Sequence, residues 1–236
     1  MREIKLFCLP YAGGSADIYA RWRTYLNSSI KLCPIELPGR SKRAKDPIYT
    51  NMREAVEDIA RLVENETHDS DYAVFGHSMG SIITYELVCK LFEEGMKLPK
   101  HIFFSGRYPP CIKKQGKNMH LLPDDELIRE AVSLGGIPEK LLKYPFLVET
   151  AVNCLRADYT VLEKYCHNPE IRQFDVDISV LSGTNDELAT DEDMKYWERY
   201  TTKSCTFYTF DQGHFYLHNN AEAIVKIINN TLVVAE

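Results

Sequence analysis

The sequence predicts an α/β fold: a mostly parallel central sheet flanked by helices, with a helical insertion. Short apolar runs alternate along the 236 residues with stripes of helical periodicity, and this order is typical of parallel strands joined by helices. The run Tyr72–Phe75 is apolar throughout, as expected for a strand that is covered on both faces. The alternation is interrupted between residues 105 and 178, where the patterning is helical.

The first half of the chain predicts three strands and three helices. Pro10 ends the first strand, and Pro38 with Gly39 ends the second. Ser15 or Asp17 could cap the first helix. In chain order, the predicted elements are a strand over Ile4–Leu9, a helix ending near Leu26, a strand over Lys31–Leu37, a helix over Asn51–Glu66, a strand over Tyr72–Phe75 and a mostly buried helix that follows Ser78 and includes Ile82–Phe92.

The second half predicts three more strands and a long helical interval. The strands are His101–Ser105, Ile178–Ser182 and Cys205–Phe210; the helices are Asp124–Leu134, Glu139–Lys143, Phe146–Tyr165, Asp191–Tyr200 and Asn220–Val233. A structureless loop as long as this interval would be unusual in a compact domain. We therefore expect residues 1–236 to form a single domain in which residues 109–174 are a helical insertion that covers the active site as a lid.

Composition and charge exclude several classes of protein. The formal net charge of −6 disfavours a nucleic-acid binder. No apolar run approaches the length of a membrane span and the N-terminus lacks the core of a signal peptide, so we expect no membrane association and a cytoplasmic location. The seven cysteines are scattered and form no Cys-x-x-Cys pair, which indicates reduced thiols. We expect a monomer without metal or cofactor.

The segment Gly76-His77-Ser78-Met79-Gly80 lies between a predicted strand and a predicted helix. In that setting, Gly-x-Ser-x-Gly is the nucleophile elbow of α/β-hydrolases. Small flanking residues permit a strained turn that holds the serine oxygen clear of the sheet, beside a helix N-terminus that favours developing negative charge. We predict that Ser78 is a catalytic nucleophile and that His77 packs or hydrogen-bonds without reacting. An ordinary glycine-rich turn is the alternative.

A serine nucleophile needs a base, and His214 is the predicted one. In α/β-hydrolases the acid and then the histidine follow the serine along the chain, each in a loop after a strand. His214 comes directly after the last predicted strand, at the edge of the sheet where Ser78 emerges. His218, four residues later and expected at the surface, is the alternative base.

The base needs an orienting carboxylate, and Asp186 is the predicted acid. It lies in the loop after the strand Ile178–Ser182, at the same edge of the sheet as the serine. Its rivals are Glu187, Asp191 and Asp193, of which the last two are expected in the first turn of a helix, where acidic residues are common.

The transition state of acyl transfer needs an oxyanion hole made of two backbone N–H groups. One is expected from Met79, the residue after the nucleophile. The other is expected from the loop after the first strand, Tyr11–Gly14, where glycines allow close approach of the backbone. Ala12 is the predicted donor, and Tyr11 is the alternative.

Seven motifs, spread over nearly the whole chain, carry a family resemblance. They are Leu9–Gly14, Glu36–Arg40, Phe75–Gly80, Leu122–Glu126, Leu134–Pro138, Leu155–Tyr159 and Gly213–Phe215. With these motifs the chain resembles the type II thioesterases that work beside nonribosomal peptide and polyketide synthases. The three motifs between residues 122 and 159 are the specific ones, because general hydrolases lack these lid signatures.

The resemblance implies a substrate and a partner. The substrate would be an acyl thioester on the phosphopantetheine arm of an acyl or peptidyl carrier protein, and the role would be the removal of stalled or wrong acyl groups from the assembly line. Thioesterases that release medium-chain fatty acids share the motifs, so such an enzyme is an alternative, as is a general carboxylesterase. A catalytically silent binding protein of the same fold is a third possibility, which an intact serine, acid and histidine disfavour.

Two basic runs could attract an acidic carrier protein. They are residues 40–45 and residues 113–117. Because the chain as a whole is acidic, attraction would require such local patches. Solvated loops are an equally good interpretation of runs this short.

Overall fold

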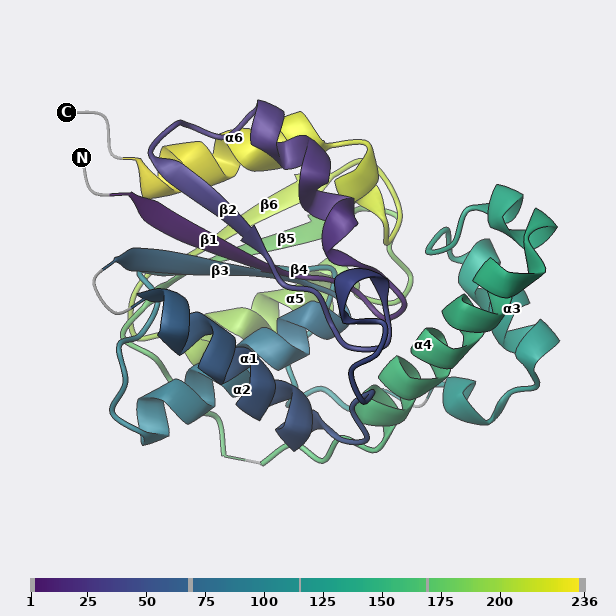
Figure 1. The fold of residues 1–236 in the computed structure, drawn as a ribbon. Coiled ribbons are helices and arrows are strands. Elements are labelled where there is room, and N and C mark those ends of the chain that lie inside the picture. The colour runs from purple at the N-terminus through teal and green to yellow at the C-terminus, as the bar shows by residue number, and fades with distance from the viewer. Residues whose placement is uncertain (1–2, 68–69, 115, 169, 234–236) are drawn as a thin grey trace.

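A six-stranded sheet forms the centre of the computed structural model, which describes residues 3–67, 70–114, 116–168 and 170–233 (Figure 1). The strands lie in the order β2-β1-β3-β4-β5-β6 and every neighbouring pair is parallel. Their carboxyl ends therefore lie along one edge of the sheet. The strands are β1 Ile4–Leu9, β2 Ile30–Pro34, β3 Asp71–His77, β4 His101–Ser105, β5 Asp177–Gly183 and β6 Cys205–Phe210.

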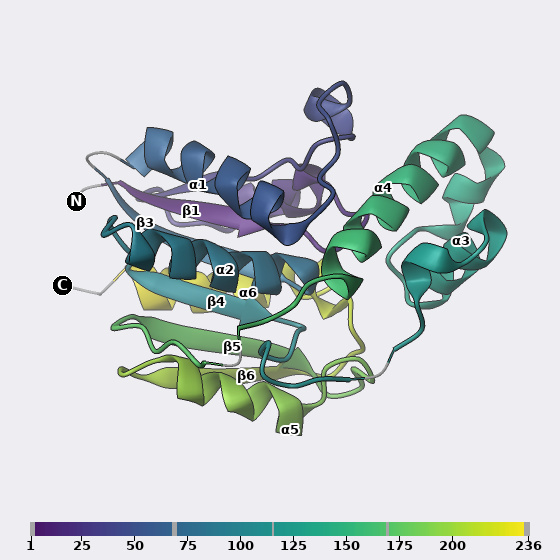
Figure 2. The ribbon, with the colours of Figure 1, turned by 90° about the horizontal axis from the view of Figure 1, so that it is seen from below.

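Helices cover both faces of the sheet (Figures 1 and 2). One face carries α1 Met52–Thr67, α2 Met79–Glu93 and α5 Asp191–Met194; the other carries the 3₁₀ helix η1 Ala16–Thr24 and α6 Ala221–Leu232. Side chains of β3 point alternately to the two layers, since the period of a strand is two. Val74 packs with the α1 and α2 layer, whereas Phe75 packs with Trp22 of η1 and with α6. Both faces of β3 are thus buried, as its apolar sequence predicts.

All six predicted strands are confirmed, but four elements differ in form or by more than two residues at an end. One of them is the helix expected over Glu139–Lys143, which is the 3₁₀ helix η4. The helix expected to reach Leu26 is a 3₁₀ helix, and so is the second half of the helix expected over 191–200, η5 Lys195–Tyr200. The first contains the buried pair Tyr19 and Trp22, and the second contains Trp197 and Tyr200. Because a 3₁₀ helix has three residues per turn, side chains three residues apart lie on the same face of the helix. The strand expected to reach Leu37 ends at Pro34, which is paired with Cys8 near the end of β1.

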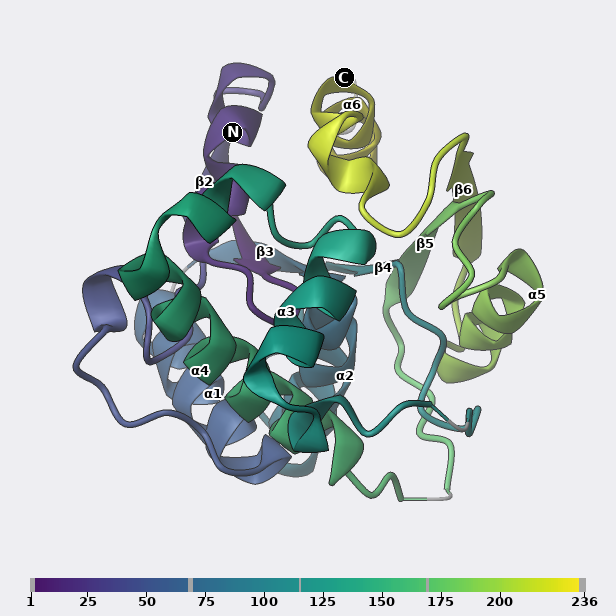
Figure 3. The same ribbon diagram turned by 90° about the vertical axis from the view of Figure 1, so that its right-hand side faces the viewer.

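The described residues of the interval 109–174 include four helical segments and lie beyond the carboxyl edge of the sheet (Figures 1 and 3). It contains η3 Met119–Leu121, α3 Asp124–Ser133, η4 Glu139–Lys143 and α4 Pro145–Glu163. Leu127 and Ile128 of α3 pack with Val152 and Leu155 of α4 in a small apolar cluster of their own. Within the described ranges, no helix has the length and apolar character needed to cross a membrane.

Candidate active site

Ser78 occupies a sharp turn between β3 and α2, at the carboxyl edge of the sheet. Its backbone has φ 53° and ψ −113°, a conformation that costs a residue with a side chain about 1–3 kcal/mol. The turn is held by its neighbours. The N–H of Ser78 donates to the carbonyl of Ser105 (2.8 Å), and the hydroxyl of Ser81 donates to the carbonyl of Gly76 (2.7 Å). Ser78 is thus fixed in a strained conformation at the N-terminus of α2.

The two glycines of the turn are required by close backbone approaches. A Cβ on Gly76 would lie 2.3 Å from the carbonyl oxygen of Gly80. A Cβ on Gly80 would lie 2.3 Å from the carbonyl oxygen of Leu9, at the end of β1. Both obstacles are backbone atoms, which cannot move aside as a flexible side chain can. The turn therefore brings α2 against the loop that follows β1.

We expect Gly80→Ala to lower the free energy of unfolding by about 1–3 kcal/mol, the usual cost of overpacking. The added methyl group must push the N-terminus of α2 away from Leu9, so activity should fall as well. Urea denaturation measures the stability change. Gly116→Ala is the control, since a Cβ there has no atom within 4 Å, and a change below about 0.5 kcal/mol is expected. Equal stability of the two variants would contradict the packing argument.

The structure brings the three predicted triad side chains together. The Nε2 of His214 is 3.0 Å from the Oγ of Ser78, and its Nδ1 is 2.8 Å from an oxygen of Asp186. The other oxygen of Asp186 accepts from the backbone N–H groups of Leu188 (2.9 Å) and Ala189 (3.2 Å). Because the carboxylate accepts the Nδ1 proton, Nε2 has a free lone pair facing the serine hydroxyl. This arrangement can withdraw the serine proton as the oxygen attacks a carbonyl carbon.

The rival acids have other partners. Asp191 accepts a hydrogen bond from the hydroxyl of Ser182 (2.6 Å), and Asp193 completes the capping box of α5. Glu187 is exposed to solvent. In the described part of the chain, none of these three carboxylates bonds to His214.

The alternative base, His218, lies at the rim of the site. Its Nε2 is 3.1 Å from the hydroxyl of Tyr11, and its ring stacks on Phe215 with 6.0 Å between the centroids. Phe215 follows His214 directly, and it also meets Tyr11 edge-on at 4.8 Å. His218 thus supports the loop that carries His214.

A second buried network lies beside the triad, and apart from the elbow motif no sequence pattern predicts it. The Nδ1 of His77 is 2.8 Å from the hydroxyl of Ser105, which in turn is hydrogen-bonded to the hydroxyl of Tyr216. Tyr216 donates to the carbonyl of Leu181 (2.8 Å). Burial, together with the nearby His214, holds the pKa of His77 well below its ordinary value. His77 is therefore neutral beside His214, as expected for a residue that hydrogen-bonds without reacting.

The two predicted oxyanion donors lie on adjoining segments. Met79 is the first residue of α2, where N–H groups have no partner within the helix. The loop with Ala12 follows Leu9, whose carbonyl lies against Gly80 of the same turn. Within the described ranges, neither the N–H of Ala12 nor that of Met79 donates to a protein acceptor.

The helical interval contacts two loops of this site. A Cβ on Gly136, between α3 and η4, would lie 2.9 Å from the ring of Phe215, the neighbour of His214. A Cβ on Gly13, in the loop with Ala12, would lie 2.6 Å from the side chain of Leu155 on α4. The interval therefore packs against both the histidine loop and the loop after β1.

Within the described residues, four of the seven basic side chains in the two runs are paired with carboxylates. Arg40 is buried, with both of its terminal nitrogens bonded to Asp158 of α4. Arg43 is paired with Asp46 (2.6 Å) and Asp58 (2.7 Å). In the second run, Lys114 and Lys117 are also paired with carboxylates, and Gln115 lies outside the described residues. Arg40 in particular cannot be a surface contact for a partner.

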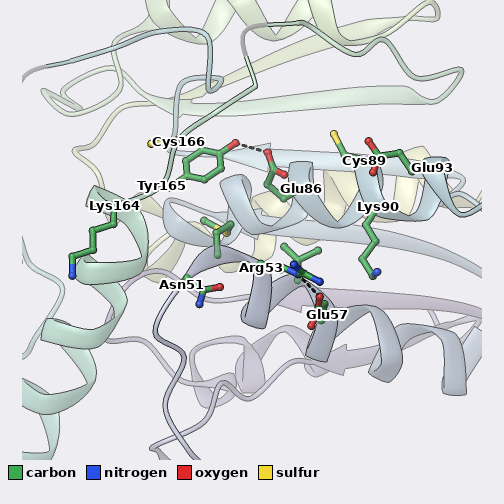
Figure 4. A pocket seen from close by; sticks show the side chains of 12 residues that line it. Asn51, Arg53, Glu57, Glu86, Cys89, Lys90, Glu93, Lys164, Tyr165 and Cys166 are labelled. Atoms are coloured by element: carbon green, nitrogen blue, oxygen red, sulfur yellow. Dashed lines mark hydrogen bonds and ion pairs between the residues drawn. The ribbon is translucent and has the colours of Figure 1, made fainter.

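A groove of about 480 Å³ lies between α1, α2 and the segment after α4 (Figure 4). Its lining includes Arg53 and Lys164, and the hydroxyl of Tyr165 bonds to Glu86 across it. None of the triad residues lines this groove, so it does not hold the reacting groups. Across the described residues, no three His, Cys, Asp or Glu side chains are grouped as metal ligands would be.

The chain is similar over almost its full length to known thioesterases. The family model described as thioesterase domain matches residues 4–232. LgrE of Brevibacillus parabrevis, named a linear gramicidin dehydrogenase, is 33% identical over 98% of this chain and 88% of its own. The medium-chain S-acyl fatty acid synthase thioesterase of Anas platyrhynchos is 29% identical over 97% of this chain and 92% of its own.

Two solved structures share the fold closely. ClbQ, from the colibactin NRPS/PKS pathway, has a TM-score of 0.92 and 33% identity, covering 98% of this chain and 97% of ClbQ. BorB, a type II thioesterase from the borrelidin biosynthetic cluster, has a TM-score of 0.86 and 30% identity, covering 96% and 91%. With the parallel strand order, these similarities confirm the predicted α/β-hydrolase fold.

Proposed function

The chain belongs to the thioesterase family, and from this premise we propose that it hydrolyses acyl thioesters on the phosphopantetheine arm of acyl or peptidyl carrier proteins. The observation that carries the proposal is the line from Ser78 through His214 to Asp186, with separations of 3.0 and 2.8 Å. The pathway named for ClbQ and the cluster named for BorB support a carrier-bound substrate. The proposed role is the removal of stalled or wrong acyl groups from a nonribosomal peptide or polyketide assembly line.

The geometry supports a two-step mechanism. Ser78 attacks the thioester carbonyl while its proton passes to Nε2 of His214, and Asp186 stabilises the imidazolium that forms. The N–H groups of Ala12 and Met79 hold the oxyanion of the tetrahedral intermediate. Its collapse breaks the carbon–sulfur bond, and the thiol of the arm leaves with the proton from His214.

The acyl-enzyme is then hydrolysed by the same groups in reverse roles. His214 takes a proton from water as the water oxygen attacks the acyl carbon, and it returns the proton to Ser78 as the acid leaves. All three side chains come from one chain, so a monomer is sufficient for this reaction. The seven cysteines are free thiols, which supports a cytoplasmic location.

We further propose that residues 109–174 act as a lid over an acyl pocket. Their helices lie at the carboxyl edge of the sheet (Figure 3). The segment after α3 approaches Phe215, and α4 approaches Gly13. Exposed apolar side chains are concentrated on this interval, including Leu121, Tyr144 and Phe146, with 69%, 59% and 76% of their surfaces accessible. Such side chains suit a segment that must meet an acyl chain or a docked partner.

One alternative is a thioesterase that releases medium-chain fatty acids. The relative from Anas platyrhynchos supports it, because that protein is named for this activity. The difference lies in the acyl group and the carrier, not in the reacting residues. The same assay can therefore decide between the two.

A second alternative is a dehydrogenase that transfers hydride, because the relative LgrE is named a dehydrogenase. The sequence after β1 disfavours this activity. Dinucleotide-binding folds carry Gly-x-Gly-x-x-Gly between the first strand and the first helix. Here that segment reads Pro10-Tyr11-Ala12-Gly13-Gly14-Ser15. The strand order also differs from 3-2-1-4-5-6.

We expect hydrolysis of a carrier-bound thioester to exceed that of the same acyl group on N-acetylcysteamine by at least about tenfold in kcat/KM, since only the carrier adds docking contacts. The measurement uses carrier proteins loaded with acetyl, aminoacyl, malonyl and octanoyl groups, and it scores the mass of the released arm. Preference for octanoyl on any carrier would favour the fatty acyl alternative. Equal rates on oxygen esters would favour a general carboxylesterase, and oxidation of NAD(P)H would favour the dehydrogenase.

A further inference from the structure

A buried ion pair joins α4 to the main body of the protein. Arg40, in the segment after β2, and Asp158, on α4, lie 118 residues apart in the chain, and only 7% and 5% of their side chains are exposed. Two hydrogen bonds of 2.8 Å connect the guanidinium to the two carboxylate oxygens. The pair is bidentate and geometrically specific. A buried ion pair often adds little to the stability of a fold. We therefore infer the role of this pair from its other contacts.

Both members of the pair reach the loop after β1. An oxygen of Asp158 also accepts the backbone N–H of Gly13, at 2.7 Å. A terminal nitrogen of Arg40 also donates to the carbonyl of Gly14, at 2.8 Å. One donor and one acceptor of this loop are therefore fixed by the same ion pair, immediately after Ala12.

The loop needs such support because its turn can adopt two forms. The N–H of Gly14 donates to the carbonyl of Tyr11 (2.9 Å), and Gly13 has φ +78°, which together define a type II turn with Ala12 and Gly13 at its centre. In a type I turn the peptide between those two residues is rotated by about half a turn. Glycine tolerates either form. The bond from Gly13 to Asp158 selects one of them.

We propose that Arg40 and Asp158 are positioning residues that hold the Ala12 N–H in place for the oxyanion. This proposal deepens the proposed function and rests on it. The carboxylate fixes the central peptide of the turn, which joins Ala12 to Gly13, and thereby restrains Ala12, whose own N–H lies on the preceding peptide. The guanidinium fixes both the carboxylate and the following carbonyl. Since Asp158 belongs to the lid, the same contacts make the oxyanion loop depend on the seating of α4.

The test separates positioning from stability with a double variant, Arg40→Met with Asp158→Leu. Apolar replacement of both members of a buried ion pair usually preserves folding, yet it leaves the N–H of Gly13 without its acceptor. Asp158→Asn is the conservative variant, since its carbonyl can still accept that N–H. Asp124→Asn is the matched control, because Asp124 also pairs with an arginine of α4, Arg156, but is 76% exposed.

Activity is measured on a p-nitrophenyl ester, which a Ser-His-Asp site can hydrolyse whatever its natural substrate. Binding of a trifluoromethyl ketone, which adds to Ser78 as a tetrahedral oxyanion, is measured in parallel. If the wild type cleaves the ester and binds the ketone but hydrolyses no thioester, the proposed function fails while this test remains valid.

We expect the folded double variant to lose about 10- to 100-fold in kcat, less than the complete loss of an oxyanion donor, with KM changed by less than about threefold. Affinity for the ketone should fall by the same factor as kcat/KM. Asp158→Asn should recover part of the loss, and Asp124→Asn should match the wild type. A folded double variant with wild-type kcat and ketone affinity, or a loss confined to KM, would overturn the proposal. If the double variant does not fold, the same two readouts on Arg40→Lys decide, because lysine keeps the charge but cannot bond both carboxylate oxygens and the carbonyl of Gly14, and wild-type values there overturn the proposal.

Discussion

Replacing Ser78 with alanine is expected to lower kcat by about six orders of magnitude, as removal of the nucleophile does in other triad hydrolases. The reason is that, in the part of the chain that the structure describes, the hydroxyl of Ser78 is the one group hydrogen-bonded to Nε2 of His214, at 3.0 Å. Turnover is measured on the best acyl thioester, with the fold monitored by circular dichroism. The variant should remain folded, since Ser78 is only partly buried and the turn is held by its backbone and by Ser81.

Two further variants make this expectation specific. Ser133→Ala removes an exposed hydroxyl of α3 and should leave kcat within about twofold of the wild type. The double variant Ser78→Ala with His214→Ala should lose no more than Ser78→Ala alone, because triad members act as a unit. A rate near wild type in Ser78→Ala would show that another residue is the nucleophile.

Asp186→Asn is expected to reduce kcat by about four orders of magnitude. An asparagine can present its amide to His214, so that Nδ1 becomes the acceptor and Nε2 carries the proton, which removes the lone pair that faces Ser78. The backbone N–H groups of Leu188 and Ala189, which now bond to the other carboxylate oxygen, should still hold the side chain in place. The loss should therefore appear in kcat with little change in stability.

Glu187→Gln is the matched control for this variant. Glu187 is the next residue in the same loop and is exposed, whereas 4% of the surface of Asp186 is accessible. We expect its kcat to stay within about twofold of the wild type. Asp191→Asn removes a partner of Ser182 and should likewise leave the triad intact. If Glu187 or Asp191 proved to be the costly position, Asp186 would lose its proposed role.

Local sequence patterns were sufficient for the strands and for the candidate triad. Each strand is an apolar run bounded by punctuating residues, and Ser78, Asp186 and His214 each follow a strand at the edge where parallel strands end. The motif order then selects one acid and one base among several. The choice between an α-helix and a 3₁₀ helix was less predictable. In η1 that choice follows the burial of Tyr19 and Trp22 in the core, which depends on tertiary packing.

Contacts between distant segments were not predictable in the same way. Arg40 lies among basic residues, and nothing local distinguishes it from an exposed arginine. Its burial depends on Asp158, on a helix whose position over the sheet the periodicity of the chain does not encode. The one sequence feature that could have pointed to this ion pair is that Arg40 and Asp158 both lie within motifs of the family resemblance. The network of His77, Ser105 and Tyr216 is likewise assembled from three separate elements.

The acyl-enzyme on Ser78 is tested most directly by the mass of the intact protein, quenched in acid within milliseconds of mixing with an octanoyl or acetyl carrier protein. The proposed mechanism predicts a transient species heavier by the acyl group, which peptide mapping places on Ser78. It should persist longer in His214→Ala if that variant is acylated at all, because deacylation needs the base. Release of the acyl group without any covalent species, or a species mapped to another residue, would contradict the account.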